Sequence, residues 1–148
     1  MDTFAKYPHY RLSLPRPIIP PKGYPSIPIS IGEHIRKRRI DLGLLQIEVA
    51  RVIGVTESTV WNWEHGTEPE LRYMPKVIEF LGYVPFECSE DPVGQLRYFK
   101  LVNGLSYERL GDLMSRDPEQ LTDWLSGRHR PNSNNLKAVE SFLAQTPQ

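Results

Sequence analysis

The chain has 148 residues, of which 18 are basic and 18 acidic, so its net charge is zero. This length allows one domain or two small ones. No apolar run is long enough to cross a membrane, and the N-terminus lacks the pattern of a signal peptide, so we expect neither membrane association nor secretion. The single cysteine, Cys88, excludes an intramolecular disulfide framework and favours a cytoplasmic location.

Residues 1–29 are predicted to form an extended arm. They contain seven prolines, and this density disfavours helix and favours polyproline II. Three interpretations stay open: a disordered tail, a strap packed on the globular part, or a basic arm that follows DNA. The last rests on the charges of the first thirty residues, where one acidic side chain, Asp2, stands against Lys6, Arg11, Arg16 and Lys22.

A first helix is predicted to begin after Ser30, which together with Glu33 has the spacing of a capping box. Its buried stripe is predicted to contain Ile31, Ile35, Ile40 and Leu42, with Gly43 at its end. The basic run at residues 36–39 covers about 300° of a helix, so its side chains cannot all face one partner. We expect about half of this run to be a solvated helix face.

Two short helices over residues 46–53 and 57–65 are predicted next, joined by a tight turn at Gly54. Thr56 can cap the second helix, and the small side chain of Ala50 allows the two helices to cross closely. The predicted buried stripe consists of Val49, Val52, Ile53, Val55, Val60 and Trp63. The outward positions of the second helix are then Glu57, Ser58, Trp61 and Asn62, and Gly66 follows as a stop. This layout can place one helix in the major groove of DNA.

The segment from residue 31 to about residue 86 resembles the Cro/repressor-type (Xre-type) helix-turn-helix family. The matching residues are Gln46, Glu48, Val49, Ala50, Gly54, Val55, Ser58, Thr59, Val60, Trp63, Glu64 and Gly66. The resemblance implies an all-α domain of five helices. The sequence itself predicts a loop at residues 68–70 and a helix over residues 74–81, closed by Gly82 and ended by Pro85.

The second half of the chain repeats the first after a shift of 61 positions, which aligns Gly104 with Gly43 and Trp124 with Trp63. Apolar positions also agree, including Leu110 with Val49 and Leu113 with Val52. We therefore expect an extended arm at 1–29 and two tandem helix-turn-helix bundles, at 30–87 and 91–145.

The two copies differ where DNA would be met. Tyr107 stands in place of Gln46 and Ser115 in place of Gly54, and the second recognition-type helix carries Glu119 and Asp123. Carboxylates oppose phosphate and suit few base edges. We prefer a degenerate domain used for packing or dimerisation. A weaker backbone-binding half that uses residues 128–130 is the alternative.

For the first copy, the resemblance implies that Glu57, Ser58 and Asn62 read base edges. Asn62 can pair with adenine and Glu57 can accept from cytosine, while Ser58 suits several bases. We expect Thr56 and Trp61 to contact the DNA backbone; the alternative for Trp61 is partial burial under the first helix or against the arm. Gln46 is expected both to bond a phosphate and to brace the recognition helix. Arg72, with Lys76 nearby, either clasps the backbone or is simply solvated.

The sequence thus predicts a cytoplasmic regulator that binds double-stranded DNA, with no cofactor and no metal. The four histidines are scattered and no catalytic constellation is recognisable, so we expect no enzyme. Either a homodimer or a pseudo-dimeric monomer is compatible with the tandem. The alternative is a protein-interaction module, antitoxin-like or an adaptor, which kept the fold without strong DNA binding; the neutral charge favours this alternative.

Overall fold

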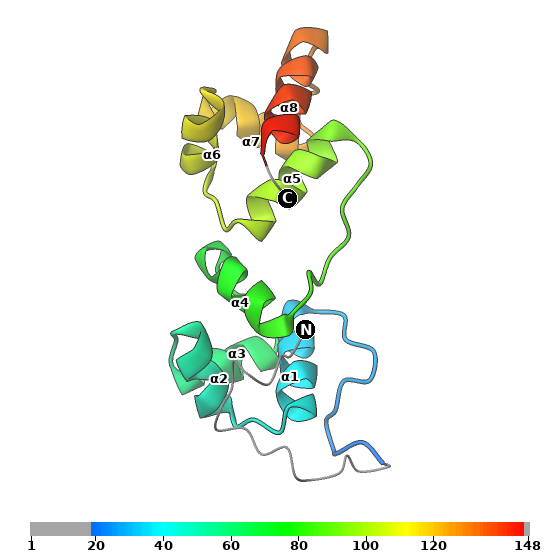
Figure 1. The fold of residues 1–148 in the computed structure, drawn as a ribbon, viewed down its shortest axis with the longest axis vertical. Coiled ribbons are helices and arrows are strands. Elements are labelled where there is room, and N and C mark those ends of the chain that lie inside the picture. The colour runs from blue at the N-terminus through cyan, green and yellow to red at the C-terminus, as the bar shows by residue number, and fades with distance from the viewer. Residues whose placement is uncertain (1–18, 147–148) are drawn as a thin grey trace. The chain divides into compact units, whose positions relative to one another are not determined.

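The computed structural model describes residues 19–146, and over this range the chain forms eight α-helices and one 3₁₀ turn, without a strand (Figure 1). The predicted all-α class is confirmed. The chain divides into two compact units, residues 1–85 and 86–148, which are described separately below. Within the described range, none of the helices combines the length and the hydropathy that crossing a bilayer requires.

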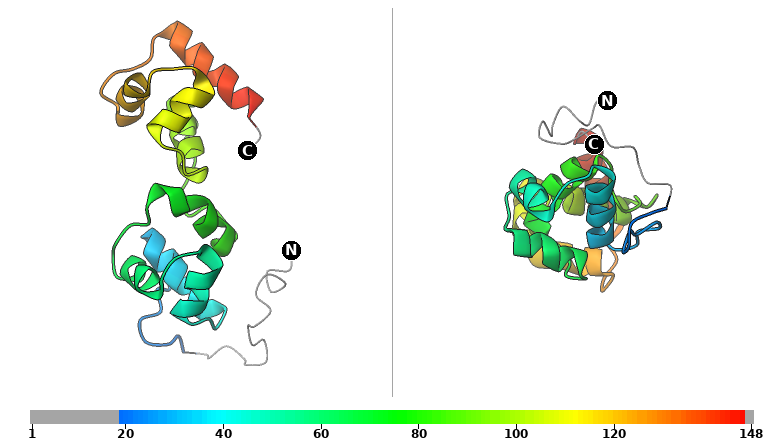
Figure 2. Two further views of the ribbon diagram at one scale, coloured as in Figure 1. Left: turned by 90° about the vertical axis from the view of Figure 1, so that its left-hand side faces the viewer. Right: turned by 90° about the horizontal axis from the view of Figure 1, so that it is seen from below.

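The first unit consists of α1 (Ile31–Asp41), α2 (Gln46–Ile53), α3 (Glu57–Glu64), the 3₁₀ turn η2 (Leu71–Tyr73) and α4 (Met74–Leu81). The expectation of five α-helices is wrong here, because the segment between α3 and α4 forms only this single turn. Helix α3 packs against both α1 and α2 (Figures 1 and 2). The core contains Ile35, Leu42, Leu44, Val49, Ala50, Ile53, Val60, Trp63, Val77, Phe80 and Leu81.

The helix ends follow the predicted capping residues. Ser30 Oγ accepts from the Glu33 amide at 3.1 Å, and the Glu33 carboxylate accepts from the amides of Ser30 and Ile29. These backbone donors lower the pKa of Glu33. Thr56 Oγ1 accepts from the Thr59 amide at 3.2 Å, and Gly54 takes a φ of 88° at the turn. The predicted capping box, N-cap and turn glycine are therefore confirmed.

A close helix crossing joins α1 to the end of α3. Gly32 is buried in the first turn of α1, and a Cβ atom placed there would lie 1.7 Å from the carbonyl oxygen of Trp63. Real Cβ atoms do not approach a backbone oxygen this closely, so only glycine fits. This contact brings the C-terminal end of α3 next to α1.

Part of the arm lies along α1. Tyr24 Oη donates to Asp41 Oδ1 at 2.7 Å, and Lys37 Nζ lies 5.5 Å from the centre of the Tyr24 ring. Lys37 also pairs with Asp41 at 3.0 Å, and this hydrogen bond raises the pKa of Lys37. The turn at Gly23 rests on the guanidinium of Arg36. Residues 19–24 thus include a packed turn, whereas residues 1–18 lie outside the described range.

The second unit contains α5 (Pro92–Val102), α6 (Tyr107–Met114), α7 (Pro118–Ser126) and α8 (Ser133–Gln145). Helices α5, α6 and α7 each begin 61 residues after α1, α2 and α3, so the sequence shift is also a structural register. Their core contains Leu96, Leu110, Leu121, Trp124, Leu125, Val139 and Leu143. Ser115 follows α6 with a φ of 55°, in the place that Gly54 takes after α2.

Three predicted core positions are wrong. Ile40 is only half-buried and lies outside the core, and two positions that stand 61 residues apart are exposed. Val52 is 37% exposed and Leu113 is 56% exposed. In α2 the inward residues are Val49, Ala50 and Ile53. Val52 lies about 100° around the helix from the centre of these three positions, outside the face that meets the core. A spacing of three and four residues alone does not distinguish this flank of the helix from its buried face.

Candidate nucleic-acid interface

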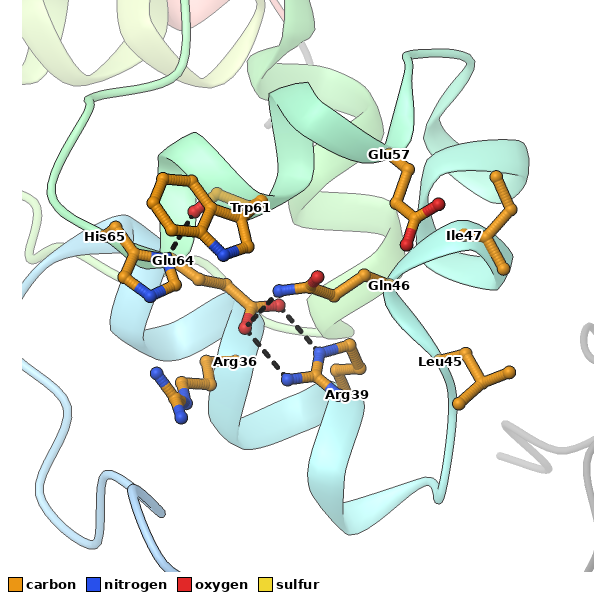
Figure 3. A pocket seen from close by; sticks show the side chains of 9 residues that line it. All are labelled: Arg36, Arg39, Leu45, Gln46, Ile47, Glu57, Trp61, Glu64 and His65. Atoms are coloured by element: carbon orange, nitrogen blue, oxygen red, sulfur yellow. Dashed lines mark hydrogen bonds and ion pairs between the residues drawn. The ribbon is translucent and has the colours of Figure 1, made fainter.

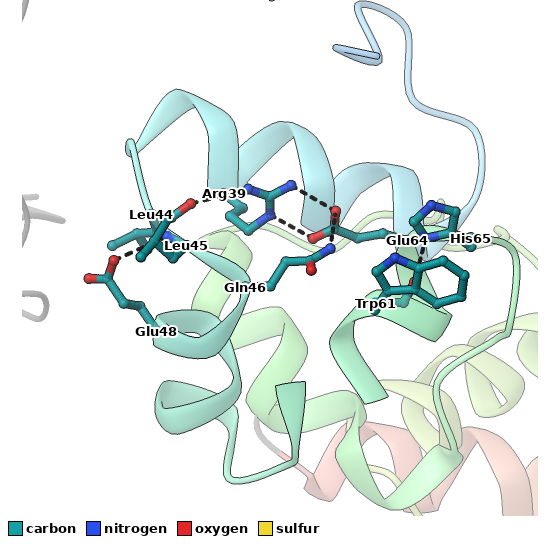
Figure 4. Close-up of polar contacts among 8 residues, drawn as sticks. All are labelled: Arg39, Leu44, Leu45, Gln46, Glu48, Trp61, Glu64 and His65. Atoms are coloured by element: carbon teal, nitrogen blue, oxygen red, sulfur yellow. Dashed lines mark hydrogen bonds and ion pairs between the residues drawn. The ribbon is translucent and has the colours of Figure 1, made fainter. Parts of the chain in front are cut away.

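A buried carboxylate joins the first three helices of the first unit. The Glu64 side chain is fully buried, and its two oxygens accept from Arg39 Nε at 2.7 Å and Arg39 Nη2 at 2.9 Å (Figure 4). Gln46 Nε2 donates to the same carboxylate at 3.2 Å. Arg39 was not predicted as a partner of Glu64. One residue of α1, one of α2 and one of α3 therefore meet at a single point.

Beside this junction lies an open cleft of about 450 Å³ (Figure 3). It is bounded by α1, by the start of α2 and by α3. Its lining residues are Arg36, Arg39, Leu45, Gln46, Ile47, Glu57, Trp61, Glu64 and His65. The structure thus brings together three of the predicted site residues, namely Gln46, Glu57 and Trp61.

The other predicted base-reading residues lie on the open face of α3. Ser58 and Asn62 are exposed, as is Glu57. The Thr56 hydroxyl is engaged in the cap of α3 and lies 2.8 Å from Thr59 Oγ1. Contacts of these side chains with bases or phosphates stay predictions.

Arg72 lies apart from the cleft residues. Its Nε pairs with Glu70 at 3.0 Å, and its guanidinium lies 4.8 Å from the centre of the Tyr73 ring. Both members of the ion pair are about two-thirds exposed, so water screens it strongly. Arg72 therefore remains available to another anion, and both predicted alternatives, a phosphate contact and a solvated side chain, stay open.

Trp61 and His65 form an aromatic pair at the end of α3. Trp61 is 49% exposed, and its ring stacks on that of His65 with centroids 3.8 Å apart and an interplanar angle of 16°. His65 Nδ1 also lies 2.7 Å from the carbonyl oxygen of Trp61. No role for His65 was predicted, but the i, i+4 spacing of an aromatic residue and a histidine on one helix is a signal that could have indicated this contact.

The basic run of α1 is largely engaged inside the unit. Lys37 pairs with Asp41, Arg38 Nε donates to the carbonyl oxygen of Phe80 at 3.3 Å, and Arg39 pairs with Glu64. Arg36 differs from these three. Its Nε is buried without a hydrogen-bond partner, and within the described range no carboxylate pairs with it.

The corresponding face of the second unit is organised by a carboxylate. An open cleft of about 530 Å³ along α7 is lined by Asp117, Glu119, Gln120, Asp123, Trp124, Arg128 and His129. Asp123, which stands in the place of Asn62, binds Arg128 at 3.0 Å and His129 Nδ1 at 3.2 Å. Arg128 and His129 are both about two-thirds exposed, so water screens these pairs strongly, as it does the pair of Arg72 with Glu70.

Part of the chain matches a known family. Residues 35–87 match the family model described as Helix-turn-helix, which covers just over a third of the chain. No solved structure matches the chain. The matched range begins within α1, contains α2, α3, η2 and α4, and includes both sides of the cleft that holds Gln46 and Trp61.

Proposed function

Residues 35–87 form a helix-turn-helix domain of the Cro/repressor type, and from this premise we propose that the chain binds specific sequences of double-stranded DNA as a transcriptional regulator. The observation that carries the proposal is the division of α3 into two faces. Its inner face holds Val60, Trp63 and the anchored Glu64, while Ser58 and Asn62 are exposed on the outer one. A helix fixed from behind and polar in front suits the major groove.

In this proposal α3 supplies the base contacts. Asn62 offers a donor and an acceptor that match the edge of adenine, and Glu57 can accept from the amino group of cytosine. The junction at Glu64 restricts how α3 can move relative to α1 and α2. Rigid support of this kind preserves the geometry that bidentate recognition of a base requires.

Gln46 is proposed to contact the DNA backbone. An amide nitrogen carries two hydrogens, and only one of them is directed to Glu64. The other can donate to a phosphate oxygen near the start of α2. The bond to Glu64 fixes which end of the amide faces inward, so the two roles predicted for Gln46 are compatible.

The second unit favours a different function. Three carboxylates, those of Asp117, Glu119 and Asp123, line the cleft along α7 together with a single arginine, so this face presents mainly acidic side chains to a duplex. We propose that this unit contacts protein, either a second copy of the chain or another partner, and contributes little to DNA affinity. A protein-interaction role for the whole chain is the alternative that the neutral net charge supports.

Selection from random duplexes at moderate salt tests the proposed function. We expect an enriched motif with an adenine that is no longer preferred in Asn62→Ala, since one good base contact contributes ~1–3 kcal/mol of discrimination. Asn134→Ala, at an exposed position of α8, is the matched control and should select the same motif as the unaltered chain. If no motif is enriched, the regulator proposal is wrong and the interaction module is favoured.

A further inference from the structure

The bond between His65 and Trp61 determines which nitrogen of the imidazole carries hydrogen. A carbonyl oxygen only accepts, so His65 Nδ1, at 2.7 Å from the Trp61 oxygen, must be the donor. In a neutral imidazole the other nitrogen, Nε2, is then an acceptor. It becomes a donor when the ring takes up a proton. The free edge of His65 therefore changes its hydrogen-bonding character with protonation.

This free edge faces the cleft from the side opposite to the Gln46 amide. Figure 3 shows the second ring nitrogen of His65 turned toward the side of the cleft where the Arg36 guanidinium lies. The Arg36 charge has no carboxylate partner within the described range, and the arm turn at Gly23 rests on its guanidinium. Two groups that can both donate to an anion therefore border the same open space.

We propose that His65 is a DNA-contacting residue that donates through Nε2 to a backbone phosphate lying beside Arg36, and that it does so only when protonated. This inference rests on the proposed function. A neutral His65 would present its Nε2 lone pair to the phosphate and weaken the contact. The stack on Trp61 and the bond to the Trp61 carbonyl oxygen hold the imidazole in this orientation.

The charges around His65 determine the direction of the effect. Arg36 and Arg39 approach from α1, while Glu57 and Glu64 approach from α3. Glu64 is occupied by Arg39, and in the loop beyond His65, Glu70 is paired with Arg72 while Glu68 is exposed. A phosphate between Arg36 and His65 would bring a negative charge next to the imidazole, and this charge favours the protonated ring in the complex. DNA binding should therefore be accompanied by proton uptake.

The affinity for DNA should rise as the pH is lowered, because the proposed contact requires a proton on the imidazole. One additional ionic contact steepens the dependence of log K on log salt by about 0.9. We expect the duplex chosen by selection to bind about tenfold more tightly at pH 5.5 than at pH 8, a change of 1.4 kcal/mol. Acid unfolding would act in the opposite direction and cannot mimic this gain.

The test measures dissociation constants of the selected duplex at constant ionic strength between pH 5.5 and pH 8. His65→Asn keeps an amide donor near the Trp61 carbonyl but cannot take up a proton, so its affinity should vary much less with pH. His65→Arg carries a permanent charge and should bind tightly at every pH. The matched control is His129→Asn, which alters an exposed histidine of the second unit and should retain the pH dependence of the unaltered chain.

The outcomes separate this inference from the proposed function. If a motif is selected but His65→Asn shows the same pH dependence and salt slope as the unaltered chain, the role of His65 is refuted while DNA binding stands. If the selection yields no motif, the proposed function itself fails. Thermal unfolding at each pH shows whether the variants remain folded during the measurement.

Discussion

Replacing Glu64 with glutamine should destabilise the first unit because it leaves the Arg39 guanidinium without its counter-ion. Breaking a buried ion pair by removing one partner costs about 3–5 kcal/mol. The Glu64 side chain is fully buried, but the Arg39 side chain retains 16% exposure, so water can partly solvate the remaining charge. We therefore expect a loss near the lower limit, about 3 kcal/mol. The carbonyl oxygen of the introduced amide can still accept from Gln46, which limits further losses.

Hydrogen exchange followed by mass spectrometry measures this loss in each unit separately. A loss of about 3 kcal/mol corresponds to an approximately hundredfold decrease in the protection of amides in α1 and α3. The amides of α5 and α8 in the second unit provide an internal control and should exchange as before. The double variant Arg39→Met with Glu64→Leu removes both charges and should regain most of the lost stability, since apolar replacements of buried pairs are often neutral.

Two results would refute this reasoning. If Glu64→Gln lowers the free energy of unfolding by less than about 1 kcal/mol, water or another acceptor solvates the Arg39 guanidinium, and the ion pair contributes no more than an exposed pair does. A double variant as unstable as Glu64→Gln would mean that the loss comes from packing rather than from an uncompensated charge.

Two further predictions concern the helix connections and the pH. Gly54→Ser should destabilise the first unit by about 1 kcal/mol, and Ser115→Gly should stabilise the second unit by up to a similar amount, because a positive φ disfavours residues with a Cβ atom. Urea unfolding measures both changes in stability. Changes of the same sign in the two variants would contradict the role of φ at these positions. Burial lowers the pKa of His34, which lies 2.7 Å from Tyr83 Oη, so the folded state takes up a proton less readily than the unfolded chain and the first unit should lose stability as the pH falls through about 6.5. His34→Asn should reduce this loss between pH 7.5 and pH 5.5, and an unchanged loss would assign it to other groups.

The helix boundaries could be predicted from the sequence because their signals are local. Ser30, Thr56 and Asp117 are N-caps whose side chains bond to amides two or three residues ahead. Gly54 and Gly82 end helices through backbone conformations that depend on one residue. Because each of these signals lies within a few residues of the helix end that it determines, the sequence predicts the bounds of α2 and α4 correctly.

The contacts between helices could be predicted only in part. Arg39 and Glu64 lie 25 positions apart, and the basic run around Arg39 looks the same in sequence whether its members face solvent or a buried carboxylate. The exposure of Val52 depends on how far the core extends around α2, which the apolar pattern does not specify. The stack of Trp61 on His65 lies on the exposed side of α3, and the spacing of apolar residues predicts only the buried side of a helix.

The crossing at Gly32 also means that the first helices of the two units cannot replace one another. In the register of 61 residues, the second unit has Val93 where the first has Gly32, and Val93 packs against the core of its own unit. A hybrid in which α5 of the second unit replaces α1 of the first would place a branched side chain where even a Cβ atom meets the Trp63 carbonyl oxygen. An exchange of helices between the two units across this position would therefore produce a chain whose first unit cannot close.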